Sequence, residues 1–116
     1  MNIEKGIYDA LSPLVDGRVF PDIAPAGTAR PYITFQQIGG RTLNPLSNEP
    51  SGKRNAFMQI NVWSDTRLGA VSLSLDVEDV LRTTVDARPQ AAATSIFEPD
   101  TNLYGTIQDF SIWGDR

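Results

Sequence analysis

The chain has 116 residues and a formal net charge of −4, which is the size of a single small domain. A hydrophobic content of 41% is enough for a buried core. The chain has no cysteine and no histidine, which excludes disulfides, thiolate nucleophiles and catalysis by a histidine base. Its mild acidity argues against broad nucleic-acid binding, and no apolar run approaches the roughly 18–20 residues of a membrane span. We therefore expect one domain over residues 1–116, without catalytic residues, cofactor, metal or membrane contact.

The first predicted element is an amphipathic helix over residues 3–15. Apolar residues recur there at helical spacing, and Asn2 is a candidate N-cap. Pro13 removes one backbone donor and clashes with the preceding turn, so we expect the helix to end or kink near Leu11–Ser12. A short extended piece, Arg18–Pro21, and a Pro/Gly-rich loop follow.

Residues 32–38 predict a strand, and a long loop follows it. The strand is rich in aromatic and β-branched residues. The loop, Gly39–Arg54, is the longest stretch without periodicity and carries Arg41, Lys53 and Arg54. We expect a flexible, basic projection over residues 39–54 that contacts a partner. Direct contact of these three cations with DNA is the weaker alternative, because it would be salt-sensitive and would not read bases.

The strongest periodic signal is in Asn55–Thr84, which predicts a strand running into a long helix. Met58, Ile60 and Val62 alternate with polar residues, as in a strand with one buried face. Ser64, Asp65 and Thr66 are then candidate helix caps. The predicted core face of the helix comprises Ala70, Leu73, Val77, Val80, Leu81 and Thr84.

A second apolar set lies nearly opposite the core face of this helix: Leu68, Val71 and Leu75. A helix that is apolar on two sides needs two partners. These residues are therefore a candidate subunit interface. The alternative is that they pack under a loop or strand of the same chain.

Strands are predicted over residues 92–97 and 103–113, and in the latter Gln108 and Asp109 mark the solvent-exposed part. The order is α-β-β-α-β-β, with a plausible hairpin link in each strand pair. We therefore predict an α+β fold with a mostly antiparallel sheet of four strands, or slightly more, and two helices packed on one face.

Carboxylates are the only residues that suggest catalysis or metal binding. They are Asp86, Glu98, Asp100, Asp109 and Asp115. They lie at turns and connectors, near the chain end or, for Asp109, in the solvent-exposed part of a predicted strand, where acidic residues are expected for solubility and capping. Neither a calcium-binding DxDxDG loop nor a GxxxxGK[ST] phosphate loop is present. We interpret these acids as structural, and an enzyme as the least favoured class.

The order of the segments resembles the phage tail completion, or tail-to-head joining, proteins of long-tailed phages and prophages, which are similar in architecture to tail terminators. The resemblance rests on an ordered set of segments between residues 7 and 113. They are IYDAL (7–11), GRVFP (17–21), APAG (24–27), RPYITF (30–35), QINVWS (59–64) and DFSIW (109–113).

The resemblance implies a structural role and no catalytic residues. Such proteins form a ring, commonly a hexamer, that caps the tail tube at its head-proximal end and docks on the head connector. The implied partners are further copies of the chain, the tail tube protein and the head–tail connector, with weak DNA contact in the lumen. The implied location is the virion tail, and the host cytoplasm during assembly. The alternatives are a head-completion adaptor on the portal side and a small protein-binding domain outside virions.

Overall fold

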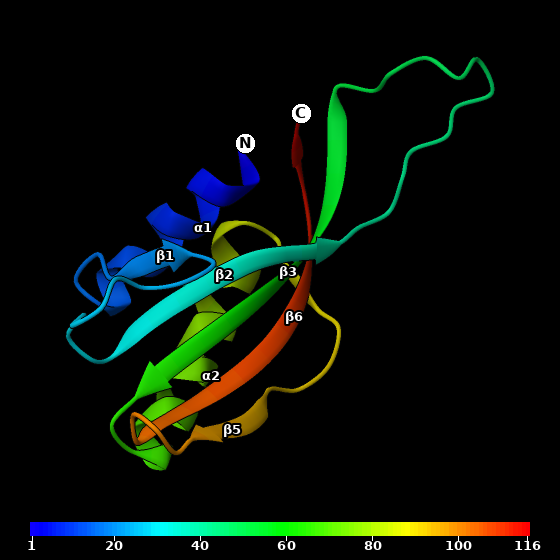
Figure 1. Ribbon diagram of the computed structural model, residues 1–116. Coiled ribbons are helices and arrows are strands. Elements are labelled where there is room, and N and C mark those ends of the chain that lie inside the picture. The colour runs from blue at the N-terminus through cyan, green and yellow to red at the C-terminus, as the bar shows by residue number, and fades with distance from the viewer.

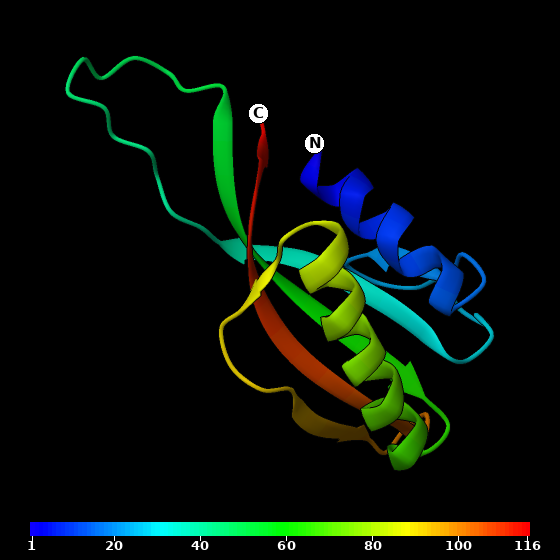
Figure 2. The same cartoon turned by 180° about the vertical axis from the view of Figure 1, so that it is seen from behind.

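The protein is described by a computed structural model of residues 1–116, in which two helices pack on one mixed β-sheet (Figure 1). The elements are α1 (Ile3–Leu11), the 3₁₀ turn η1 (Ser12–Leu14), β1 (Val19–Pro21), β2 (Tyr32–Gly39), β3 (Lys53–Ser64), α2 (Arg67–Thr84), β4 (Arg88–Pro89), β5 (Thr94–Glu98) and β6 (Leu103–Asp115). The strand order is β1-β2-β3-β6-β4, and β5 also pairs with β6. Both helices lie on the same face of the sheet, as Figure 2 shows. The predicted α+β class and the one-sided helices are confirmed.

The sheet has two strands beyond the predicted four, and it is mostly antiparallel, as predicted, with one parallel pair. It has six strands, and β1 runs parallel to β2 with Val19 opposite Ile33. The prediction of four strands omitted β1 and β4, because strands of three and two residues carry no readable period. Pro21, which has no N–H to donate, is tolerated in β1 because this strand lies at the sheet edge.

The first helix ends where Pro13 predicts. The Asn2 side chain accepts a hydrogen bond from Lys5 N at 2.9 Å and caps α1, which stops at Leu11. Pro13 then lies in the 3₁₀ turn η1. The predicted range of 3–15 therefore divides into an α-helix and a tighter last turn.

The core lies between the helices and the inner face of the sheet. Met58, Ile60 and Val62 of β3 are at most 1% exposed, as their alternation predicts. From α2 the buried apolar residues are Ala70, Leu73, Val77 and Leu81, with Val80 partly buried. Thr84 is exposed, so its assignment to the core face was wrong: it is the last residue of α2.

The middle of β6 is also more buried than predicted. Gln108 is 5% exposed, and its Nε2 donates to Glu78 Oε1 at 2.7 Å and to Ala91 O at 3.0 Å. Because both amide protons of Gln108 are donated in hydrogen bonds, burying this side chain costs little free energy. The assignment of Gln108 to the solvent-exposed part of the strand was therefore wrong.

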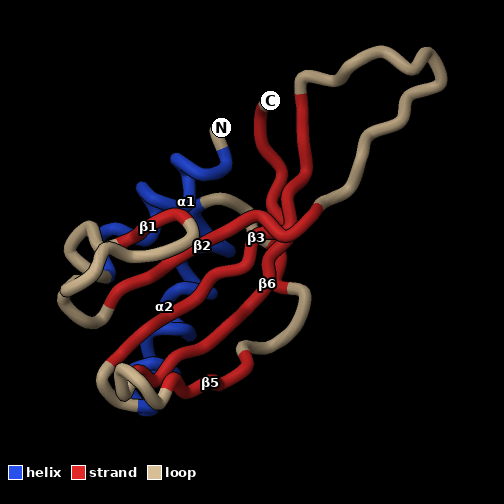
Figure 3. The backbone as a smooth tube through the Cα atoms, in the orientation of Figure 1, coloured by secondary structure: helices blue, strands red, loops and turns tan.

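The hairpin between β2 and β3 extends well beyond the body of the molecule, and makes it 52 Å long against 25 and 24 Å in the other directions. Figure 3 shows the tan connecting loop projecting from the red strands at one end. The start of β3 and the end of β6 remain paired up to the base of this projection, from Asn55 opposite Trp113 to Lys53 opposite Asp115. The protein is thus a compact body with a narrow projection.

Candidate assembly surfaces

The projecting loop, residues 40–52, is called the arm below. Every residue from 41 to 50 is exposed, and Leu46 has its whole side chain in solvent. Asn48 N donates to Pro45 O at 2.9 Å, and Asn48 has a left-handed backbone with φ of 57°. Asn tolerates this conformation better than most residues. The arm therefore turns at residues 45–48 and presents Leu43 and Leu46 to solvent.

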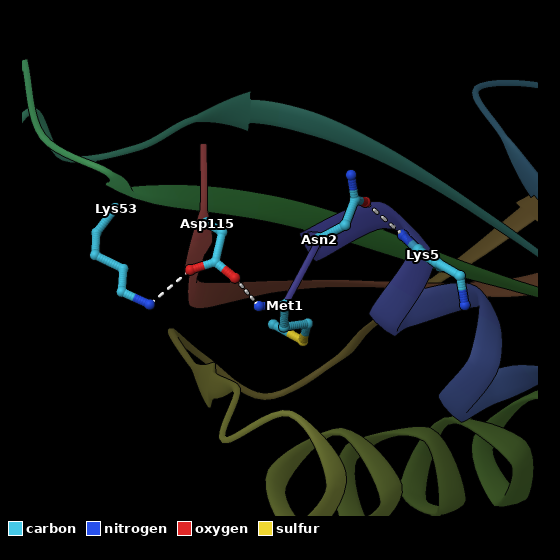
Figure 4. A network of polar contacts seen from close by, with 5 residues as sticks. All are labelled: Met1, Asn2, Lys5, Lys53 and Asp115. Carbon is cyan, nitrogen blue, oxygen red and sulfur yellow. Dashed lines mark hydrogen bonds and ion pairs between the residues drawn. The ribbon is translucent and has the colours of Figure 1, made fainter.

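A polar network ties the base of the arm to both ends of the chain (Figure 4). Lys53 Nζ lies 2.6 Å from Asp115 Oδ1, and the Met1 amino group pairs with the other oxygen of the same carboxylate. Two backbone bonds reinforce it: Asp115 N donates to Met1 O at 2.8 Å, and Arg116 N donates to Gly52 O at 2.9 Å. Hydrogen bonds from Lys53 and from the amino group lower the pKa of Asp115 from 3.8 to about 2.

Of the three cations predicted on the loop, only Arg41 belongs to the arm. Lys53 and Arg54 are the first residues of β3, so the predicted loop of 39–54 is too long at both ends; Gly39 belongs to β2. Arg54 Nη1 donates to Gln37 Oε1 at 3.0 Å, across the β2–β3 pair. The predicted strand began at Asn55, because Lys53 and Arg54 are charged residues that add no apolar position to the alternation.

Asn55 fixes the point where the arm leaves the sheet. It is 5% exposed, accepts from Arg41 N at 2.9 Å and donates to Ser111 Oγ at 2.9 Å. One side chain thus connects the first turn of the arm, β3 and β6. An Asn at the predicted strand start is the only sequence feature that points to this role.

The second surface is the outer face of α2, formed by Leu68, Val71 and Leu75. These side chains are 81%, 36% and 59% exposed, so no loop or strand of the same chain covers them. Thr66 caps the helix start by accepting from Gly69 N at 3.0 Å. The predicted spacing therefore corresponds to a real apolar stripe on a rigid helix; its role as a subunit interface stays a prediction.

Acidic residues accompany this stripe. Asp76 and Asp79 are exposed and form no ion pair. Glu78 pairs with Arg82 at 3.2 Å and accepts a hydrogen bond from the Gln108 amide. The outer side of α2 thus combines apolar side chains with two unpaired carboxylates, and Arg67 beside Leu68 is an unpaired cation at the helix start, so α2 carries a formal charge of −1 (two cations, three carboxylates).

The third surface is a cleft on the open face of the sheet, beneath the loop that joins β1 to β2. It has a volume of about 370 Å³ and is lined by Ile23, Arg30, Tyr32, Asn61, Trp63 and Leu103, among others. Arg30 holds the loop in place: it donates to Asp65 Oδ1 at 2.9 Å and to Thr101 O at 3.0 Å. Burial raises the pKa of the Tyr32 phenol.

The cleft offers contact surface rather than chemistry. Its lining contains no histidine or cysteine, because the chain has none. The chain also has no group of three or more acidic, histidine or cysteine side chains placed to hold a metal ion. The five acids weighed from the sequence are not brought together; Asp115 instead serves the base of the arm.

Comparison with known proteins decides the family. The profile of the family described as "Tail completion protein gp17" matches residues 7–115. The chain belongs to this family. It is therefore a structural phage protein of tail completion and a component of the virion, not an enzyme. The resemblance inferred from the ordered sequence segments is confirmed.

A solved structure shows the same fold. A chain in the structure titled "Virion of native gene transfer agent (GTA) particle" matches with a TM-score of 0.65 and 15% identity. The match covers 98% of this chain and 95% of that one. No protein among the curated sequences matches. Within the tail completion protein itself, neither helix has the length and apolar character needed to cross a membrane.

Proposed function

We propose that this tail completion protein is an adaptor that forms a ring at the head-proximal end of the tail tube and joins the tail to the head. The observation that carries the proposal is the outer face of α2. Leu68 is 81% exposed on a helix whose opposite side, at Ala70 and Leu81, is at most 1% exposed. An apolar stripe on a rigid, capped helix favours a permanent protein partner.

The partners are those that the family resemblance implies. The ring would contain copies of this chain, commonly six in the proteins it resembles, with the tail tube protein on one side and the head–tail connector on the other. Residues 1–116 would act as one domain, with the arm as its flexible part. Assembly would take place in the host cytoplasm.

DNA contact in the lumen is the weaker part of the proposal. Lys53 is paired with Asp115 and Arg54 is bonded to Gln37, which leaves Arg41 as the cation on the arm itself. A single charge gives little salt-dependent affinity for phosphate.

Native mass spectrometry of the protein, alone and with the tail tube protein, tests the ring. We expect a single closed species whose mass from this chain is a whole multiple of 12.7 kDa. A strict monomer under both conditions would refute it.

The second candidate is a head-completion adaptor on the portal side. Labelling the protein in intact particles and in isolated tails separates the two, because a tail adaptor stays with the tails. Recovery with heads alone would favour the portal side. The other alternative, a domain outside virions, is set aside by the family membership.

A further inference from the structure

We propose that the arm of one copy docks on the outer face of α2 of the next copy, so that one repeated head-to-tail contact builds the ring. The inference rests on the proposed function, since it assigns the two halves of the subunit interface within that ring.

The arm and the outer face of α2 cannot contact each other within one chain. Leu46 on the arm and Leu68 on α2 both have most of their side chains in solvent. Figure 2 shows that the beginning of α2, in green, lies at the opposite end of the molecule from the arm. A second copy, placed beside the first, brings an arm to each α2.

The spacing of the apolar groups is compatible on the two sides. Leu68 and Leu75 are seven residues apart on one helix, which places them about 10 Å apart along its axis. Leu43 and Leu46 are three residues apart in non-helical chain, which spans up to about 10 Å. Two arm side chains can therefore contact the two exposed leucines of α2 together.

The charges are complementary as well. The arm and its base carry four cations and two carboxylates, a formal charge of +2, which leaves −6 on the rest of the chain. These residues are Arg41, Glu49, Lys53, Arg54, Asp115 and Arg116. Arg41 has no carboxylate partner in its own chain, and neither Asp76 nor Asp79 has a cation. A net positive arm and a net negative remainder of the chain favour contact of the arm with a different patch over symmetric arm-to-arm pairing.

Such a contact has a definite symmetry. It uses two different patches, so each copy offers one free arm and one free α2, and the series ends only when it closes on itself. An isologous dimer, by contrast, would use one patch twice and stop at two copies.

Mixing two variants tests this directly. The arm variant Leu43→Ser/Leu46→Ser and the helix variant Leu68→Ser/Leu75→Ser should each lose at least about tenfold in self-association. When the two are mixed, the helix variant supplies an intact arm and the arm variant supplies an intact α2. The mixture should therefore form a 1:1 dimer that does not grow. Ile23→Ser is the matched control, because Ile23 is as exposed as Leu68 but lies over the cleft. It should assemble like the wild type.

A cross-link in assembled tails gives an independent measurement. The chain has no native cysteine, so Leu46→Cys with Val71→Cys places the only two thiols on the proposed interface. A short bismaleimide should produce a ladder of covalent multimers, whereas Leu46→Cys with Ile23→Cys should not.

The outcomes separate this inference from the function on which it rests. Rings that form with both double-serine variants, without the ladder, would overturn the arm–α2 contact and leave the adaptor function standing. Absence of any wild-type ring, with or without the tail tube protein, would overturn the function itself.

Discussion

Lys53 and Asp115 are cross-strand partners at the ends of β3 and β6, with Lys53 Nζ 2.6 Å from Asp115 Oδ1. The pair lies at the base of the arm, next to Gly114, which packs against Ile3 at the start of α1. This ion pair adds to the backbone hydrogen bonds and the Asn55 side chain that hold the base of the arm against the body.

This pair predicts an acid-sensitive arm. The pKa of Asp115 is about 2, below its ordinary 3.8, so the carboxylate stabilises the base of the arm above pH 4. That contribution should fall as the pH drops from about 4 to about 2. A carboxyl ¹³C NMR titration should give a midpoint near 2, and Asp115→Asn should remove the pH dependence of arm amide exchange. A midpoint at or above 3.8 would contradict the pairing.

Asn55→Ala should loosen the arm and destabilise the fold by about 1–3 kcal/mol, because it removes a buried side chain that bonds Arg41 N and Ser111 Oγ. Urea unfolding measures the loss, and hydrogen exchange at Arg41 reports the arm. Ser111→Ala, which leaves the bond to Arg41 intact, should not speed that exchange. Equal exchange at Arg41 in the wild type and Asn55→Ala would show that Asn55 does not anchor the arm.

The two sides of α2 should respond differently to truncation. Leu81 is fully buried, so Leu81→Ala should cost about 2–5 kcal/mol of unfolding free energy. Leu75 is 59% exposed, so Leu75→Ala should change it by no more than about 0.5 kcal/mol. Val71→Glu with Leu75→Lys should likewise leave the monomer folded while blocking assembly. Unfolding of the monomer by that double change would place this face in the core instead.

Gly105 allows β6 to pass close to β3, and Gly105→Ala should destabilise the protein by about 1–3 kcal/mol. A Cβ there would lie 2.8 Å from Val62 O and 2.8 Å from Trp63 Cε3, and the backbone oxygen cannot move aside. Trp63 fluorescence during denaturation should report the change. Gly52→Ala is the control, since its Cβ would meet nothing within 4 Å, and it should be close to neutral.

The parts of the fold that the sequence predicted are those in which burial imposes a period. Met58, Ile60 and Val62 must all face the helices, and Leu81 must face the sheet, so their spacing is readable without a structure. The outer face of α2 was found for the same reason: Leu68 and Leu75 break the expectation of a polar outer side.

The parts that the sequence did not predict depend on pairing or on distant partners. Lys53 and Arg54 are held in β3 by Asp115 and Gly114 of β6, more than 50 residues away in the chain. Gln108 can be buried because its amide donates a hydrogen bond to Glu78, 30 residues away in the chain. The parallel pairing of β1 with β2 rests on three residues, too few to show a period.

Electron microscopy of isolated tails, with the protein labelled, tests the central claim most directly. We predict one ring of label at the head-proximal end of each tail tube, and tails without the ring that fail to join heads in vitro. Label along the tube, at the distal end or only on heads would contradict the account.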